Sequence, residues 1–164
     1  MSVLKRSDED YMRVALRQAE QAFAAGEVPI GAIIVYEDEI IGRAWNQVEM
    51  LKDATAHAEI LAITQASSKI GDWRLQDATL YVTKEPCAMC AGAMVNTKLG
   101  RLVFGARDPR CGAAGSSELD VTGFSGMLHN VDVTAGLLEE ECLMIIQEFF
   151  QMRRMEAKQK KNQN

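Results

Sequence analysis

The chain of 164 residues is 48% hydrophobic and 25% charged, and it carries a formal net charge of −5. These values are typical of one soluble globular domain, and no apolar run approaches the roughly 20 residues that a membrane span needs. Residues 1–10 are polar and unlike a signal peptide, so we expect a single cytoplasmic domain over 1–164 with no membrane partner.

The first half of the chain alternates helical and strand patterns. Ser7 and Asp10 have the spacing of a capping box, the apolar residues that follow recur at helical intervals, and Gly26 ends the pattern. Two apolar runs surround the charged Glu37-Asp38-Glu39, which predicts two strands, buried on both faces, joined by a tight turn. The expected order is a helix over 7–25, strands over 28–35 and 40–44, and a polar loop over 46–55.

The second half continues the alternation. The expected elements are a helix from about 57 to before 71, a strand over 79–83, a helix over 87–97, a strand over 101–106 and a brief strand near 131–133. Segment 108–130 is rich in Gly, Ser and Asp, with room for one short helix. A last helix, marked by Leu138, Cys142 and Ile146, runs on into the C-terminal tail. Helices interleaved with strands predict an α/β sandwich with helices on both faces of the sheet.

Positive charge is concentrated at the end of the chain. Segment 151–164 has five basic residues and one acidic residue, for +4, which leaves −9 on 1–150. A basic helix end can bind a polyanion, and it can equally be a solvated, fraying terminus. Charge alone does not choose between these two interpretations.

Two short motifs carry the chemistry. His57-Ala58-Glu59 and Pro86-Cys87-x-x-Cys90 together give three metal ligands, His57, Cys87 and Cys90. A catalytic zinc uses three protein ligands and keeps one position open for water, whose pKa it lowers to roughly 7. Glu59 is then free to act as the catalytic proton shuttle. The H-x-E and P-C-x-x-C pair is the pattern of zinc deaminases that act on nucleic-acid bases.

The spacing within the motifs also predicts where the metal lies. Cys87 and Cys90 are three apart and share one helical face, whereas His57 and Glu59 are two apart and would point nearly opposite ways. Both pairs can converge on one ion if it lies just beyond two helix N-termini. The partial positive charge of the helix N-termini would also favour the thiolate forms of Cys87 and Cys90.

A purely structural zinc is the alternative reading of these ligands. Structural sites are usually closed by a fourth Cys or His, for which Cys111 and His129 are the candidates. That reading leaves Glu59 without a role. Disulfide pairing of the four cysteines is disfavoured because nothing else suggests secretion, so Cys111 and Cys142 are expected to be reduced thiols, Cys142 in a core helix.

The motifs and their surroundings resemble the bacterial tRNA-specific adenosine deaminase family, within the cytidine-deaminase-like superfamily. The resembling segments are Gly26-Glu27-Val28-Pro29-Ile30-Gly31-Ala32, Thr55-Ala56-His57-Ala58-Glu59-Ile60, Glu85-Pro86-Cys87-Ala88-Met89-Cys90-Ala91-Gly92, Phe104-Gly105-Ala106-Arg107-Asp108 and Gly112-Ala113-Ala114-Gly115-Ser116. The resemblance implies a three-layer α/β/α sandwich with a mixed five-stranded sheet, one Zn²⁺ per subunit, a homodimer, and a tRNA anticodon stem-loop as partner. The implied reaction converts the wobble adenosine to inosine, with zinc-bound hydroxide attacking C6 of adenine.

The same resemblance implies a set of substrate-binding residues, namely Val28, Pro29, Ile30, Asn46, Ala58, Pro86 and Asp108. Asn46 would hydrogen-bond the target nucleotide, the 28–30 segment would line the base pocket, and Asp108 would lie near the ribose. The backbone at Ala58 and Pro86 would contact the base and the zinc-bound oxygen. Plainer alternatives stay open, because Val28 and Ile30 also suit a core strand, and Asn46 and Asp108 suit turns.

The last helix offers further RNA contacts, Phe149, Phe150, Arg153 and Arg154. Aromatic residues on a final helix are more often core, so the arginines are the better candidates.

Two local departures from the family pattern are Lys84, where an apolar residue is expected, and the acidic Val48-Glu49 stretch. Two rival functions also remain. A deaminase of a free base or nucleotide would use the same zinc site but would have no need of the basic tail. A silent RNA-binding subunit would have no need of Glu59.

Overall fold

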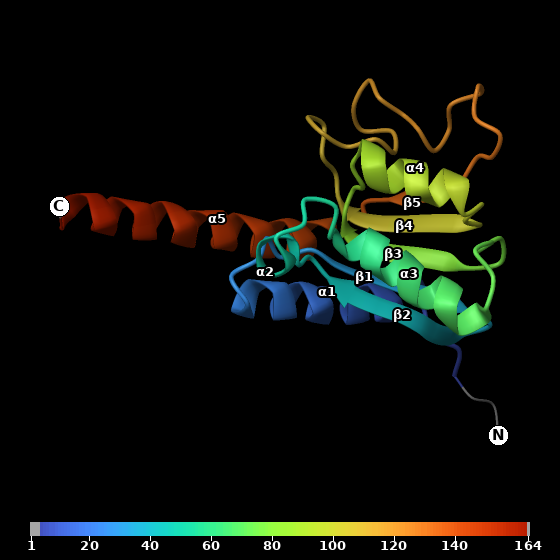
Figure 1. The fold of residues 1–164 in the computed structure, drawn as a ribbon, viewed down its shortest axis with the longest axis horizontal. Helices are drawn as coiled ribbons and strands as arrows, with labels where there is room; N and C mark the ends of the chain where they lie inside the picture. Colours follow the sequence, from blue (N-terminus) through green and yellow to red (C-terminus); the bar gives the residue numbers. More distant parts are fainter. Residues whose placement is uncertain (1–3, 164) are drawn as a thin grey trace.

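The computed structural model describes residues 4–163, so positions 1–3 and 164 of the expected domain lie outside the described residues. A five-stranded sheet carries helices on both faces (Figure 1). The strands are β1 Gly31–Tyr36, β2 Glu39–Trp45, β3 Thr79–Lys84, β4 Arg101–Ala106 and β5 Asp132–Ala135, and the helices are α1 Asp8–Ala24, α2 Val48–Leu51, α3 Ala58–Ile70, α4 Ala88–Asn96 and α5 Glu139–Asn162.

The sheet is mixed, as the resemblance implied. Its strand order is β2-β1-β3-β4-β5, with β1 antiparallel to both of its neighbours and β3, β4 and β5 mutually parallel. Antiparallel β1 and β2 are joined by the expected tight turn, in which Glu37 and Asp38 both have positive φ. The parallel strands are joined by longer crossovers, one of which contains α4.

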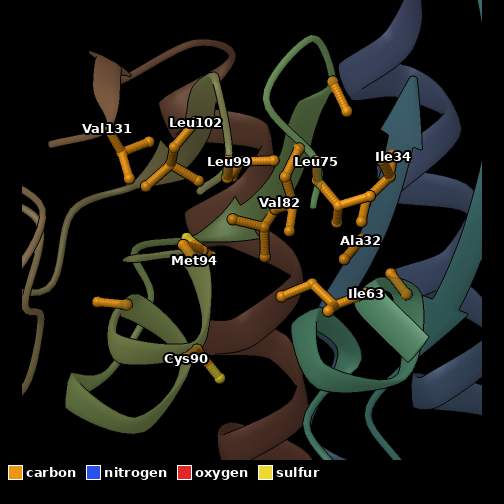
Figure 2. Packing of buried hydrophobic residues seen from close by; sticks show 14 of the residues in the cluster. Ala32, Ile34, Ile63, Leu75, Val82, Cys90, Met94, Leu99, Leu102 and Val131 are labelled. Carbon is orange, nitrogen blue, oxygen red and sulfur yellow. The ribbon is translucent and has the colours of Figure 1, made fainter. Parts of the chain in front are cut away.

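Alternation along each strand divides the core into two layers. Ala32 and Ile34 of β1 face the layer under α3 and α4, whereas Ile33 and Val35 face the layer under α1 and α5. Figure 2 shows the first layer, where Val82 and Leu102 of the sheet lie near Ile63 of α3 and Met94 of α4. The three-layer α/β/α sandwich is therefore confirmed.

Helix α1 begins and packs as the sequence predicts. Ser7 and Asp10 form the capping box, with the Asp10 amide donating to Ser7 Oγ and the Ser7 amide donating to Asp10 Oδ2. Gly31 allows α1 to lie against β1, because a Cβ at that position would be 2.0 Å from the Ala15 carbonyl oxygen. Position 31 therefore requires glycine.

A charged cluster ties the start of α1 to the sheet. The Asp8 carboxylate accepts hydrogen bonds from both terminal nitrogens of Arg101, at 2.9 and 2.8 Å, and from the Tyr81 hydroxyl at 2.7 Å. The Arg101 hydrogen bonds lower the pKa of Asp8 below its ordinary value of 3.8. A carboxyl with a lowered pKa stabilises the folded state above its unfolded pKa, and this stabilisation is lost as pH falls through the folded pKa.

Asp8→Asn is therefore expected to lower the free energy of unfolding at pH 7 by about 1 kcal/mol, a modest value because both partners are partly exposed. The deficit should shrink as pH falls below 3.8 and through the lowered pKa of Asp8 in the folded state, where the wild-type carboxyl also loses its charge. Urea denaturation at a series of pH values measures this loss in the free energy of unfolding, with Asp77→Asn at an exposed position as the matched control. An equal deficit at every pH would exclude the ionised carboxylate as its source.

Several sequence-based expectations are corrected. Strand β1 begins at Gly31 and not at 28, because Pro29 has no N–H to donate to a ladder, and 28–30 instead forms a tight turn in which the Ile30 amide donates to the Val28 carbonyl at 2.8 Å. Strand β2 is an edge strand with Glu39 and Arg43 exposed, so burial of both its faces was wrong. The loop 46–55 contains the short helix α2, and 108–130 contains only turns and one isolated bridge.

Helix α5 confirms the continuation into the basic tail. Its 24 residues begin in the core, where Cys142 is buried and reduced, and its second half projects past the sheet (Figure 1). Residues 153–163 are exposed. No helix within residues 4–163 is long and apolar enough to cross a membrane.

Candidate active site

The three predicted ligands come together at the starts of two helices. His57 is the N-cap residue of α3, Cys87 is the N-cap residue of α4, and Cys90 lies in the first turn of α4. His57 Nδ1 is 3.6 Å from Cys87 Sγ and 3.5 Å from Cys90 Sγ. The expected convergence of two helix N-termini on one point is therefore found.

The geometry of this cluster fits zinc. Zn–S bonds of about 2.3 Å and Zn–N bonds of about 2.05 Å at tetrahedral angles put nitrogen and sulfur roughly 3.6 Å apart. The observed separations of 3.5 and 3.6 Å match that edge length, and imidazole with two thiolates is a donor set typical of zinc. His57, Cys87 and Cys90 could therefore hold one zinc ion without rearrangement.

The fourth ligand of a closed structural site is not found among residues 4–163. The metal-ligating group there consists of His57, Cys87 and Cys90 alone. Cys111 is exposed, and His129 Nε2 lies 2.7 Å from the Leu99 carbonyl oxygen. Three protein ligands leave a coordination position open, as catalytic zinc requires.

The protein environment favours the thiolate at Cys87. Hydrogen bonds with Cys90 and His57 lower the pKa of the Cys87 thiol to about 3. The same contacts raise the pKa of Cys90 and of His57, because each shares its proton with the Cys87 sulfur. Metal binding would release the protons that Cys90 and His57 hold, which leaves a cluster of negative charge beside two helix N-termini of positive potential.

Glu59 lies in the first turn of α3 and is not one of the ligands. It is only 4% exposed, and burial raises the pKa of its carboxyl. A raised pKa makes the carboxyl readier to hold a proton, as a proton shuttle must be. Glu59 and His57 line the same cavity.

A cavity of about 710 Å³ opens beside His57 and Glu59. Its lining residues are Ala25, Gly26, Glu27, Val28, Ile30, Asn46, Val48, Glu49, His57, Ala58, Glu59, Phe149, Phe150 and Arg153. Segments far apart in the sequence therefore surround one space, with the ligand helix α3 on one side and the last helix α5 on another. This volume suits a base and its ribose.

The cavity includes most of the predicted substrate-binding residues. Val28, Ile30, Asn46 and Ala58 line it, and the Asn46 side-chain amide donates to the Val28 carbonyl at 3.4 Å. Pro29 and Pro86 are buried and do not line it. Their predicted contacts stay predictions.

Asp108 lies in a turn and not on the cavity wall. Its Oδ1 accepts hydrogen bonds from the amides of Arg110 and Cys111, and its Oδ2 pairs with Lys84 Nζ at 3.0 Å. Both oxygens thus have partners within the protein. The turn that the sequence offered as an alternative is present, and the ribose contact stays a prediction.

The four predicted RNA contacts differ in exposure. Phe149 is 3% exposed and packs edge-on against Phe23, whereas Phe150 is 43% exposed. The Arg153 guanidinium lies 5.2 Å above the Phe149 ring and donates to the Gly26 carbonyl at 2.6 Å. Arg154 is exposed and lies outside the cavity. Arg153 therefore closes one cavity wall, and Phe149 is chiefly a core residue.

Glu27 is a member of the site that the sequence motifs did not predict. Its side chain is 1% exposed, and its two oxygens accept hydrogen bonds from the amides of Glu49, at 3.1 Å, and Met50, at 2.6 Å. This carboxylate holds the start of α2 and lines the cavity. The available signal was an acidic residue directly before the apolar Val28-Pro29-Ile30.

Comparisons with known proteins agree with the geometry. A family of MafB19-like deaminases matches residues 6–154. A tRNA-specific adenosine deaminase of Haemophilus influenzae is 47% identical over 152 residues, covering 92% of this chain and 87% of that protein.

Solved structures share the fold. A structure of a tRNA:A34 deaminase, from work on A-to-I editing at the wobble position, is 42% identical with a TM-score of 0.79, covering 82% of this chain and 97% of the other. A guanine deaminase from Nitrosomonas europaea is 26% identical with a TM-score of 0.76, covering 90% of this chain and 86% of the other.

Proposed function

The chain belongs to the bacterial tRNA-specific adenosine deaminase family, and from this membership we propose which of its residues carry the reaction. The reaction is zinc-dependent hydrolytic deamination of adenosine to inosine at the wobble position of a tRNA anticodon. The observation that carries the proposal is the meeting of His57, Cys87 and Cys90 with buried Glu59, beside a cavity large enough for a base and its ribose.

His57, Cys87 and Cys90 would hold the zinc ion. When bound there, zinc lowers the pKa of water to about 7 and so supplies hydroxide for attack at C6 of adenine. Glu59 would accept the proton that the water loses and pass it to a ring nitrogen; it would then take the proton of the hydroxyl newly attached at C6 and give it to the amino group, which leaves as ammonia. Burial supports this role, because a raised pKa lets the carboxyl both accept and release the proton.

The cavity residues bind and orient the base. Val28 and Ile30 supply apolar walls, and the Asn46 amide, held at the Val28 carbonyl, hydrogen-bonds the nucleotide. Glu27 holds the start of α2, and Val48 and Glu49 of that helix also line the cavity. An anticodon loop suits such a cavity because its unpaired bases can be splayed out of the stack.

The rest of the RNA is bound along α5. Phe150 is exposed at the cavity mouth for base stacking, and the basic end of α5 follows the phosphates. Arg154 and the lysines beyond it are exposed and carry that charge. The proposal further includes a homodimer, which sedimentation would test, and a cytoplasmic location.

The substrate is tested by incubating the zinc-loaded protein with an adenosine-containing anticodon stem-loop and, separately, with free adenosine, cytosine, guanine and deoxycytidylate. Inosine is expected in the RNA alone. The guanine arm matters because a guanine deaminase shares the fold at 26% identity. Deamination of a free base or nucleotide without RNA editing would overturn the proposal.

Truncation after Phe150 also distinguishes an RNA substrate from a free base or nucleotide. Removing the basic end of α5 is expected to raise KM for the stem-loop by at least about tenfold, since several phosphate contacts are lost. Zinc content should stay at one ion per chain. Unchanged KM for the RNA would remove the tail from the proposed binding surface.

A further inference from the structure

A buried carboxylate ties the segment after β4 to the metal-ligand segment. Glu85 directly precedes Pro86-Cys87 and is only 3% exposed. Its Oε2 accepts a hydrogen bond from the Asp108 amide at 3.2 Å, and its Oε1 accepts one from the Ser116 amide at 3.1 Å. One side chain therefore holds both ends of the loop 108–117.

The middle of this loop is held in the same place. The Ala113 amide donates to the Pro86 carbonyl at 2.9 Å, which links the loop to the residue before Cys87. Gly112 lies directly on the Glu85 carboxylate, and a Cβ there would be 1.7 Å from Oε2 and 2.4 Å from Cδ. The loop can approach this closely only because position 112 has no side chain.

Lys84 fixes the same loop from outside. Its ammonium pairs with Asp108 Oδ2 at 3.0 Å, while Glu85 binds the Asp108 amide. Two consecutive residues at the end of β3 thus hold the side chain and the backbone of Asp108. Any other loop position would leave the Glu85 carboxylate buried without donors, which is costly.

We propose that Glu85 is a positioning residue for RNA binding, which sets the loop 108–117 at the rim of the metal site. This inference rests on the proposed function and on the predicted contact of Asp108 with the ribose. Glu85 reaches neither the ligand atoms nor the cavity lining, so it acts through the loop. Its role is to give the loop a single position before the RNA arrives, which reduces the ordering cost of binding.

Glu85→Gln tests the proposal with little change in shape. The amide has one acceptor and one donor group, so one of the two backbone amides would face an NH₂. Hydrogen exchange at Asp108 and Ser116 should become at least about tenfold faster. KM for the anticodon stem-loop should rise about tenfold with kcat within about threefold, and zinc should stay at one per chain.

Glu118→Gln is the matched control, because it removes the same charge from an exposed acid just beyond the loop. It should change none of these quantities. Gly112→Ala disrupts the contact between Glu85 and the loop from the loop side, because the new Cβ must displace the Glu85 carboxylate. The double variant should be no worse than the more severe single change, because both act on one contact.

The readouts separate the inference from the proposed function. A lowered Tm with unchanged KM and unchanged RNA affinity would give Glu85 a merely structural role and overturn the inference. Unchanged exchange at Asp108 and Ser116 would overturn it as well. If the wild-type protein makes no inosine, the proposed function fails, and exchange together with stem-loop affinity from fluorescence anisotropy still decides the role of Glu85.

Discussion

Glu59→Gln is expected to lower kcat for inosine formation by about 10³-fold while the protein still binds one zinc ion per chain. Glutamine keeps the shape of the buried side chain but cannot accept and return a proton, and general acid-base help is worth roughly 10² to 10⁴ in rate. The residue lies beside the ligands without belonging to them, so metal binding should persist. Single-turnover assays on the stem-loop, with zinc measured by mass spectrometry, provide the test.

Glu59→Ala extends this test by removing the side chain. It should be as inactive as Glu59→Gln, since both lack the proton shuttle. Glu140→Gln, at an exposed position on α5, is the charge-matched control and should behave as wild type. Appreciable turnover in either Glu59 variant would remove this residue from the mechanism.

Cys90→Ser is expected to reduce bound zinc from one ion per chain to below about 0.1 and to lower kcat/KM by at least about 10³-fold. Cys90 is fully buried and supplies one of only three protein ligands, and no fourth His, Cys, Asp or Glu among residues 4–163 belongs to the ligand group. A serine hydroxyl is a far poorer ligand for zinc at neutral pH. Metal analysis after dialysis, followed by the stem-loop assay, measures both effects.

The chain contains a matched control for this substitution. Cys111 is an exposed thiol outside the ligand group, and Cys111→Ser should leave both zinc and activity unchanged. Full zinc occupancy in Cys90→Ser would show that the ligand set is different. Loss of zinc in Cys111→Ser would show that Cys111 is a fourth ligand and that the zinc site is a closed structural one.

The sequence predicted those parts of the fold that depend on local pattern. Strand β4 has the predicted bounds, and α1 has the predicted capping box, because alternation and N-capping act over a few residues. Helix α2 was missed because its first amides are capped by the Glu27 carboxylate, 22 residues away along the chain. A helix of four residues with no apolar periodicity leaves no local signal.

The site residues also divide into those that local sequence predicts and those that depend on distant contacts. His57, Cys87 and Cys90 were predictable because metal ligands have to be particular residue types at fixed spacings. Glu27 and Glu85 were not assigned roles, because a buried acid looks like a surface acid until its donors are known. Those donors are backbone amides of distant loops, and only the folded chain brings them near.

The placement of the ligands on two helix starts also has a consequence for folding. His57 and the Cys87 sulfur are separated by 30 residues, a stretch that includes all of α3 and β3. A zinc ion that joins them is a cross-link closing a loop of that length. In the chain-entropy picture, such closure is worth about 3 to 4 kcal/mol at 25 °C, as much as a disulfide of similar span. All four cysteines are free thiols, so bound zinc would be the cross-link that stabilises the fold in place of a disulfide.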